Sequence, residues 1–153
     1  MIQQTREQSA LDARRRAHHP DCFVCGQCAS LGLGVRYEPR AETGVEAKVT
    51  CPAAWEGYAG LVHGGVIASL LDGAMTNCLF AMDIAAVTAD LQVRYRHPVR
   101  VGVTARITAS AVRITPPLFV VEASITQDRR LRVTATGKFM QYRDASAHTH
   151  ESD

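Results

Sequence analysis

The sequence predicts an α+β domain in which a curved antiparallel sheet of about five to six strands wraps around one long central helix. The helix is the most apolar segment of the chain and extends from about residue 64 to Met82. Because it is apolar on nearly all sides, it must be covered on most of them. Segments in which apolar and polar residues alternate precede and follow it, and the later ones are joined by short turns. Strands joined in this way pair antiparallel.

Length and composition indicate one soluble globular domain. The chain has 153 residues, of which 46% are apolar, and a formal net charge of +2. This charge gives no electrostatic case for a nucleic-acid partner, and polar residues keep the longest apolar run short of the roughly 18 residues of a membrane span. The N-terminus lacks the apolar core of a signal peptide. We therefore expect a cytoplasmic protein that binds neither nucleic acid nor a membrane.

The chain divides into a helical lead-in, a central domain and a polar tail. Residues 1–20 are polar, and Ser9 can cap a short helix that ends near Ala17, before Pro20. We expect this helix to dock loosely, because Leu11 is its only large apolar residue. The domain itself extends over residues 21–142, and the polar tail over residues 143–153.

Five cysteines, an odd number, indicate free thiols rather than a disulfide framework. Three of them, Cys22, Cys25 and Cys28, follow His18 and His19. This spacing could form a zinc or iron–sulfur knuckle. However, a closed structural zinc site usually takes two ligand pairs from separate segments, and no second pair appears later in the chain. We therefore expect a half-buried turn of thiols and no metal site.

Six segments alternate between apolar and polar residues and are predicted strands: Leu31–Glu38, Val45–Cys51, Ala86–His97, Val101–Ile114, Leu118–Thr126 and Leu131–Tyr142. The first two form a hairpin, and an ordered loop over residues 53–62 leads from them to the helix. In the third, the alternation places Val87 on the apolar face and Thr88 on the polar face with Asp90. An open sheet has free edges, and pairing two copies edge to edge would cover them.

The start of the helix combines a His63-Gly64-Gly65 sequence with a single carboxylate, Asp72, further along. The glycines leave backbone N–H groups bare at a helix N-terminus, where a ligand can bind. A carboxylate in an apolar helix is costly to bury unless something compensates for it. Asp72 lies nine residues after His63, roughly 13 Å along a helix, which is too far for both to act on one bound group. If they share a site, two copies of the chain must form it, as in a symmetric dimer.

Three spaced motifs carry a family resemblance. The pattern His63-Gly64-Gly65-x6-Asp72, the preceding residues 57–62 and the following residues 87–99 are similar to those of hotdog-fold acyl-CoA thioesterases, in the PaaI-like branch. The sequence Cys-Phe-Val-Cys-Gly at 22–26, followed by Leu-Gly-Leu at 31–33, is typical of a bacterial subgroup of these proteins. The resemblance covers roughly residues 20–142 and agrees with the predicted order of elements.

The resemblance implies a hotdog fold, a homodimer or homotetramer, and hydrolysis of an acyl- or aryl-CoA thioester to the free acid and coenzyme A. In similar proteins the backbone N–H after the histidine polarises the thioester carbonyl; here this is Gly64, with Gly65 beside it. His63 would hold the loop, and Asp72 of the partner subunit would attack the carbonyl or activate water. Thr88 matches a hydroxyl that orients this water. No metal or redox cofactor is implied, and coenzyme A enters only as part of the substrate.

The resemblance also suggests where the substrate lies. We expect Val66 and Leu70 to line the acyl pocket, with Trp55 or Tyr58. The phosphates of coenzyme A need cationic partners. The candidates are Arg94, Arg96 and His97, with Arg100, Arg129, Arg130 and Lys138 as further options.

Two positions depart from the family pattern, and three other functions remain open. Glu56 is the nearest polar side chain in a loop where relatives carry Asn or Gln, and Gly73 stands where many carry Glu. The first alternative is a non-catalytic acyl-CoA-binding module of the same fold. The second is a hotdog dehydratase or hydratase, and the third is a thiol or zinc switch at residues 22–28.

Overall fold

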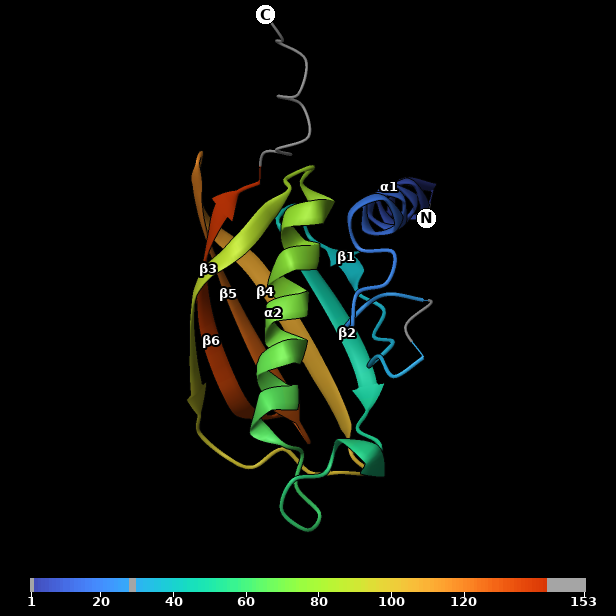
Figure 1. The fold of residues 1–153 in the computed structure, drawn as a ribbon, viewed down its shortest axis with the longest axis vertical. Coiled ribbons are helices and arrows are strands. Elements are labelled where there is room, and N and C mark those ends of the chain that lie inside the picture. Colours follow the sequence, from blue (N-terminus) through green and yellow to red (C-terminus); the bar gives the residue numbers. More distant parts are fainter. Residues whose placement is uncertain (1, 28–29, 143–153) are drawn as a thin grey trace, which may run out of the picture.

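The computed structural model describes residues 2–27 and 30–142, which contain one six-stranded antiparallel sheet. Its strand order is β1-β2-β4-β5-β6-β3. The sheet curves around helix α2, and helix α1 packs beside α2 at the β1 end of the sheet (Figure 1). The predicted α+β architecture is confirmed. The helices are α1 (Ile2–His18) and α2 (Gly64–Ala81), and the strands are β1 (Glu38–Arg40), β2 (Gly44–Thr50), β3 (Ala86–Tyr95), β4 (Thr104–Thr115), β5 (Leu118–Gln127) and β6 (Arg130–Gln141).

The side chains of α2 and of the inner face of the sheet form one core. Leu70, Leu71 and Met75 of α2 are completely buried, as are Ile107 of β4 and, almost completely, Phe119 of β5. Each buried side chain of this size stabilises the fold by roughly 1.5–3 kcal/mol. By length and composition α2 could span a membrane, but 61% of it is buried inside the fold, as in the core helix of a globular protein.

Helix α1 begins at Ile2, earlier than the predicted start at Ser9, and it docks firmly. Leu11 is only 1% exposed, and the buried Arg15 pairs with Asp12 at 3.1 Å. A buried cation needs such a partner. The expectation of loose docking is therefore wrong. The sequence gives little sign of this contact, because a long arginine stem can cover as much apolar surface as an apolar side chain.

The predicted strand Leu31–Glu38 does not form, because this segment packs on α2 instead of joining the sheet. The strand β1 includes only residues 38–40, which pair with β2. The backbone N–H groups of residues 33 and 35 donate to the carbonyl groups of residues 23 and 24. Tyr37 is completely buried, and its hydroxyl donates to the carbonyl oxygen of Leu70 at 2.8 Å. The alternation in residues 31–38 therefore reflects a face that is buried against α2 and not a strand of the sheet.

The strand β3 lies at the edge of the sheet and contains a bulge. It pairs with β6 on one side, and none of the described strands pairs with its other edge. Thr88 lies opposite Phe139, whose side chain is buried. Asp90 lies opposite Lys138, the residue next to Phe139, whose side chain is exposed. Ala89 is therefore an extra residue in β3, as in a β-bulge.

The bulge reverses the two faces of β3 at its start. Residues directly opposite each other in a sheet point to the same face, so Thr88 points inward with Phe139. Val87 points outward and is 50% exposed. The predicted faces of Val87 and Thr88 are therefore wrong, because strict alternation cannot anticipate an extra residue.

Candidate active site

His63 caps the N-terminus of α2 with its own side chain. Its Nδ1 accepts a hydrogen bond from the backbone N–H of Gly65 at 2.9 Å. In the neutral imidazole the proton is then on Nε2. Gly57 packs closely behind it, since a Cβ there would lie 3.1–3.3 Å from atoms of His63. These contacts fix the geometry of the first turn of α2.

Of the two N–H groups predicted to be bare, only one is free. The N–H of Gly65 is occupied by His63, which corrects the expectation that both glycines present bare donors. Within residues 2–27 and 30–142, no group accepts a hydrogen bond from the N–H of Gly64. The Gly64 N–H is therefore available at the positive end of the helix dipole, where it can stabilise a developing oxyanion.

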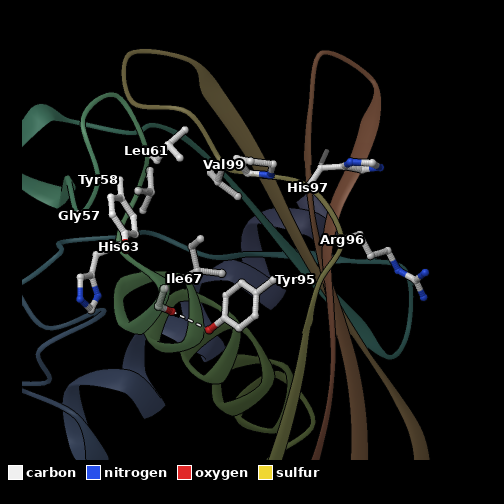
Figure 2. A pocket seen from close by; sticks show the side chains of 12 residues that line it. Gly57, Tyr58, Leu61, His63, Ile67, Tyr95, Arg96, His97 and Val99 are labelled. Carbon is white, nitrogen blue, oxygen red and sulfur yellow. Dashed lines mark hydrogen bonds between the residues drawn. The ribbon is translucent and has the colours of Figure 1, made fainter.

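Tyr95, at the end of β3, holds the same turn of α2. Its hydroxyl donates to the carbonyl oxygen of Gly64 at 2.8 Å (Figure 2). Desolvation raises the pKa of Tyr95, which keeps the phenol protonated as a donor. The sequence pattern places Tyr95 on the inner face of a strand but carries no signal for this hydrogen bond.

Asp72 and Thr88 form the second polar centre of the site. The hydroxyl of Thr88 donates to Oδ1 of Asp72 at 2.7 Å and so connects β3 to α2. Asp72 is half-buried, and its Oδ2 has no partner in the part of the chain that the structure describes. The structure thus brings two of the predicted site residues together. It does so through the bulge at Ala89, which turns Thr88 inward.

The two polar centres are separate within one chain. Gly64 and Asp72 belong to the same helix and are eight residues apart. This separation corresponds to roughly 12 Å along the helix axis. A general base must lie within about 3 Å of the proton it removes, directly or through one water molecule. A carbonyl group held at Gly64 is therefore out of reach of Asp72 in the same chain.

A cavity of about 720 Å³ lies between the loop before α2 and the end of β3 (Figure 2). This volume is in the range of pockets that enclose small-molecule ligands. Figure 2 shows Tyr58, Ile67 and Tyr95 around it, with the imidazole of His63 directed away from Tyr95. The lining residues come from two segments, 57–67 and 95–99: Gly57, Tyr58, Leu61, Val62, His63, Gly64, Ile67, Tyr95, Arg96, His97, Pro98 and Val99.

Of the four residues predicted to line an acyl pocket, only Tyr58 borders this cavity. Trp55 and Leu70 are 7% and 0% exposed and belong to the core. Val66 is half-buried and packs against the core. The apolar side chain of α2 that lines the cavity is that of Ile67, one position after Val66, and the sequence cannot distinguish these two neighbours in an apolar helix.

Glu56 shapes the loop at the wall of this cavity. Its carboxylate accepts a hydrogen bond from the backbone N–H of Gly60, and its backbone pairs with Val62. Gly60 has a positive φ of 77°, which glycine adopts without strain. The side chain of Glu56 therefore closes the loop on itself.

Two arginines and a histidine lie at the border of the cavity. Arg96 and His97 line it, and Nη2 of Arg130 lies 3.0 Å from Nε2 of His97. Desolvation and three neighbouring guanidinium groups, the first of them that of Arg130, lower the pKa of His97. Arg132, a few residues along the same strand as Arg130, has a buried Nε without a partner among the described residues. Sequence reasoning missed Arg132, because no pattern marks a cation that is buried in a strand.

The other cationic candidates lie away from the cavity or are paired. Arg94 lies opposite Thr134 on the outer face of the sheet. Lys138 pairs with Asp90 at 3.9 Å, and Arg100 pairs with Asp128. The positively charged candidates near the cavity are therefore Arg96 and Arg130, beside His97, whose lowered pKa favours the neutral imidazole.

A separate cluster lies at the C-terminal end of α1. One ligand atom from each of His19, Cys22 and Cys25 lies within 4.8 Å of the others, a grouping that could hold a metal ion. Burial raises the pKa of the Cys25 thiol to about 11, and a hydrogen bond from the side chain of Asn77 opposes this rise. None of the three residues lines the cavity. Cys28, the third cysteine of the motif, lies outside the described residues.

Residues 59–141, more than half of the chain, match the family model of the thioesterase superfamily. The chain belongs to the thioesterase superfamily. The matched region includes α2 and the strands β3 to β6, and therefore the free N–H of Gly64 and the contact between Asp72 and Thr88. No curated protein matches the chain.

Solved structures of the thioesterase superfamily share the hotdog fold. One thioesterase superfamily protein aligns with a TM-score of 0.69 and 27% identity over 72% of this chain, which spans 55% of that protein's length. The PaaI protein of Escherichia coli, from the phenylacetic acid degradation operon, aligns with a TM-score of 0.68 and 20% identity over 92% of this chain and 96% of its own. A hypothetical thioesterase of Streptococcus pneumoniae, solved with coenzyme A, aligns with a TM-score of 0.67 and 18% identity over 71% of this chain and 85% of its own.

Proposed function

We propose that the protein is an acyl-CoA thioesterase, which hydrolyses an acyl- or aryl-CoA thioester to the free acid and coenzyme A. The observation that carries this proposal is the contact between Asp72 and Thr88, since a carboxylate oriented by a hydroxyl is suited to attack a carbonyl or to activate water. The free N–H of Gly64 supplies the donor that a developing oxyanion needs. Membership of the thioesterase superfamily supports the same class of reaction.

In this proposal each site is shared by two subunits. The open edge of β3 supports it, because unpaired strand edges in natural proteins are usually covered. Two β3 edges that pair about a twofold axis would join the sheets and set the two α2 helices antiparallel. The N–H of Gly64 would then face Asp72 of the partner subunit, and the dimer would have two equivalent sites. This arrangement bridges the roughly 12 Å that separate the two groups within one chain.

The proposed reaction uses the two polar centres together. The thioester carbonyl oxygen accepts a hydrogen bond from the N–H of Gly64, and the helix dipole adds positive potential there. Asp72 of the partner subunit either removes a proton from an attacking water or attacks the carbonyl carbon to give an anhydride that water then hydrolyses. Thr88 occupies Oδ1 and leaves Oδ2 for this step. The carbon–sulfur bond breaks, the thiolate of coenzyme A takes a proton, and the acyl group leaves as the acid.

The substrate assignment draws on the cavity and on one structural neighbour. The apolar walls at Ile67 and Val99 suit an acyl or aryl group, and Arg96 with its neighbours suits the phosphates of coenzyme A. The Streptococcus pneumoniae protein was solved with coenzyme A. Two further structures of it carry an alanine in place of an aspartate and of a threonine, and these positions are sixteen residues apart, as are Asp72 and Thr88 here.

An assay of thiol release from short-chain, long-chain and aryl CoA esters tests the proposal. We expect the Asp72→Asn variant to lose about 100-fold or more in kcat, because it can neither attack nor accept a proton. Binding of the CoA ester, measured by calorimetry, should remain, since the asparagine keeps the shape of the side chain. Asp90→Asn is the matched control, because this partly exposed carboxylate lies on the outer face of β3 and its replacement should leave kcat unchanged.

The same assay separates the enzyme from a non-catalytic acyl-CoA-binding module. A wild-type protein that binds CoA esters but releases no thiol from any of them is a binding module and not a thioesterase. Equal activity of wild type and Asp72→Asn would mean that another group performs the reaction.

A further inference from the structure

His19, Cys22 and Cys25 form a cluster that the proposed function does not use. His19 directly follows α1, and the two cysteines lie in the turn after it. Nδ1 of His19 lies 3.9 Å from Sγ of Cys25, and the ligand atoms of all three residues lie within 4.8 Å of one another. The ligand atoms of one tetrahedral zinc ion lie roughly 3.5–3.8 Å apart, given bond lengths of about 2.0–2.3 Å. Small side-chain movements would therefore bring the three atoms to that geometry.

One backbone N–H group of the turn already donates to the sulfur of Cys22, and the turn closes tightly on the Cys22 backbone. The N–H of Val24 donates to Cys22 Sγ at 3.4 Å, and the N–H of Gly26 donates to the Cys22 carbonyl oxygen at 2.8 Å. A Cβ at position 26 would lie 2.4 Å from the backbone nitrogen of Cys22, so only glycine fits there. Hydrogen bonds from backbone N–H groups to a sulfur stabilise the thiolate that a metal ion requires.

His19 is held in place from two sides. Its backbone N–H donates to the carbonyl oxygen of Arg15 at 2.7 Å, which continues the last turn of α1. Its ring makes an edge contact with Phe80 of α2, with ring centroids 4.9 Å apart. This fixed ring presents Nδ1 toward Cys25. The cluster thus has two ligands from one tight turn and a third from a helix end that packs against it.

We propose that His19, Cys22 and Cys25 bind one zinc ion, with the fourth position open to water. Two thiolates and one imidazole are a known ligand set for zinc sites that keep an open position, and soft sulfur ligands select against magnesium and calcium. Binding releases the two thiol protons to solvent and needs no oxidant or reductant. The lack of a second cysteine pair in the sequence argues against a closed zinc site, but His19 supplies a third ligand and the fourth position is left to water.

The proposed zinc site adjoins the helix that carries Asp72. Val24 lies between the two cysteine ligands and packs on Gly73, where a Cβ would approach Val24 Cγ1 to 2.5 Å. Zinc would therefore tie the end of α1 and this turn to the middle of α2. Because a metal that binds only the folded state stabilises it, the thermal unfolding midpoint should rise with zinc.

Zinc titration of the reduced, metal-free full-length protein, without an affinity tag and in competition with a chromophoric chelator, tests the proposal. We expect one zinc ion per chain, and cobalt in its place should give a thiolate-to-cobalt charge-transfer band. The variants Cys22→Ser, Cys25→Ser and His19→Ala should each lose about 100-fold or more in zinc affinity. Cys78→Ser is the matched control, because this buried thiol of α2 lies outside the cluster and should leave the affinity unchanged.

Three results would overturn the proposal. The first is a wild-type protein that binds well below one equivalent of zinc. The second is zinc affinity in Cys22→Ser and Cys25→Ser equal to that of the wild type. The third is a cobalt-loaded wild type without a charge-transfer band, and this measurement needs no variant, so a variant that fails to fold cannot obscure the answer. None of these results depends on thioesterase activity.

Discussion

Asp72 has a hydrogen-bond donor because β3 contains one extra residue. Without the bulge at Ala89, Thr88 would face outward with Asp90, and the carboxylate would lack its 2.7 Å contact. A hydrogen bond to a charged group is worth about 1.5–3 kcal/mol, more than one between neutral groups. Bulges recur beside active sites because they redirect one side chain without disturbing the rest of the sheet.

Removal of the Thr88 hydroxyl should lower activity while the protein still folds. We expect Thr88→Ala to reduce kcat about 10- to 100-fold, the equivalent of one hydrogen bond to a charged acceptor. Thr88→Ser keeps the hydroxyl and should retain most of the activity. Thiol release under saturating substrate measures both variants. Equal losses in the two would show that the methyl group, and not the hydroxyl, matters at this position.

Gly64 offers a way to delete one N–H group and little else. It is the first residue of α2, where proline is well tolerated, and His63 before it has φ −60° and ψ 136°, as the residue before a proline prefers. We expect Gly64→Pro to lower kcat about 100- to 1,000-fold, as removal of an oxyanion donor does, with a thermal midpoint near that of the wild type.

The comparison with Gly64→Ala isolates the N–H group. A Cβ at this position makes only ordinary contact with the Tyr95 hydroxyl, at 3.6 Å, and the alanine keeps its N–H. Its loss of kcat should therefore be far smaller than that of Gly64→Pro. Similar losses in both variants would assign the effect to steric change and not to the missing donor.

At the scale of elements, Gly73 leaves space on the surface of α2, and Val24, in the turn that carries Cys22 and Cys25, fills it. A Cβ there would meet Val24 Cγ1 at 2.5 Å and the Tyr37 hydroxyl at 3.1 Å. We expect Gly73→Ala to destabilise the fold by about 1–3 kcal/mol through overpacking, although alanine is the better helix former. Urea unfolding measures the loss. The double variant with Val24→Ala should recover part of it, and strict additivity of the two changes would contradict this contact.

Tyr37 makes the stability of the fold sensitive to alkaline pH. Burial raises its pKa well above the ordinary value, so the folded state keeps the phenol proton longer than the unfolded chain does. The stability that the protonated phenol of Tyr37 contributes to the fold is complete below about pH 10. It is lost as the pH rises from there through the folded-state pKa. Urea unfolding at about pH 8 and pH 10.5 should show this fall, and Tyr37→Phe should reduce it. Tyr142→Phe, a half-exposed control, should not.

Helices and strands that bury one face in a single core are predicted well from the sequence. Segments that contact two different elements are not. The helix α2 repeats and the strands β2, β4, β5 and β6 alternate over most of their length as the sequence predicts, because each buries one continuous surface. The pairing of β4 shifts register near Val112, and that of β6 shifts near Arg132. The segment Leu31–Glu38 alternates equally well but packs on a helix, and the bulge in β3 has no periodic signal.

The site divides in the same way. Gly64, Asp72 and Thr88 belong to motifs, so the sequence alone singles them out as candidates for the site. The hydrogen bond of Tyr95, the use of the Gly65 N–H by His63 and the approach of His19 to the thiols depend on contacts between segments. No local pattern records such contacts.

At the scale of the whole molecule, a shared site makes a prediction about mixtures. Asp72→Asn and Gly64→Pro should each be nearly inactive alone. After the two are unfolded and refolded together, about a quarter of wild-type activity should return, because half of the dimers are mixed and each mixed dimer has one intact site of two. Refolding each variant alone is the control. A mixture no more active than its components would place both groups in one subunit.

The region that matches the superfamily is shorter than the region that folds as one unit. The superfamily match begins at residue 59, but β1 and β2 precede it, and β2 pairs with β4 over seven residue pairs. A fragment that starts at the boundary would expose the edge of β4 and the apolar flank of α2 that Val24 covers. Such an edge invites aggregation. Grafting α2 into another protein would therefore require residues 1–58 as well, although the proposed reaction uses none of their side chains.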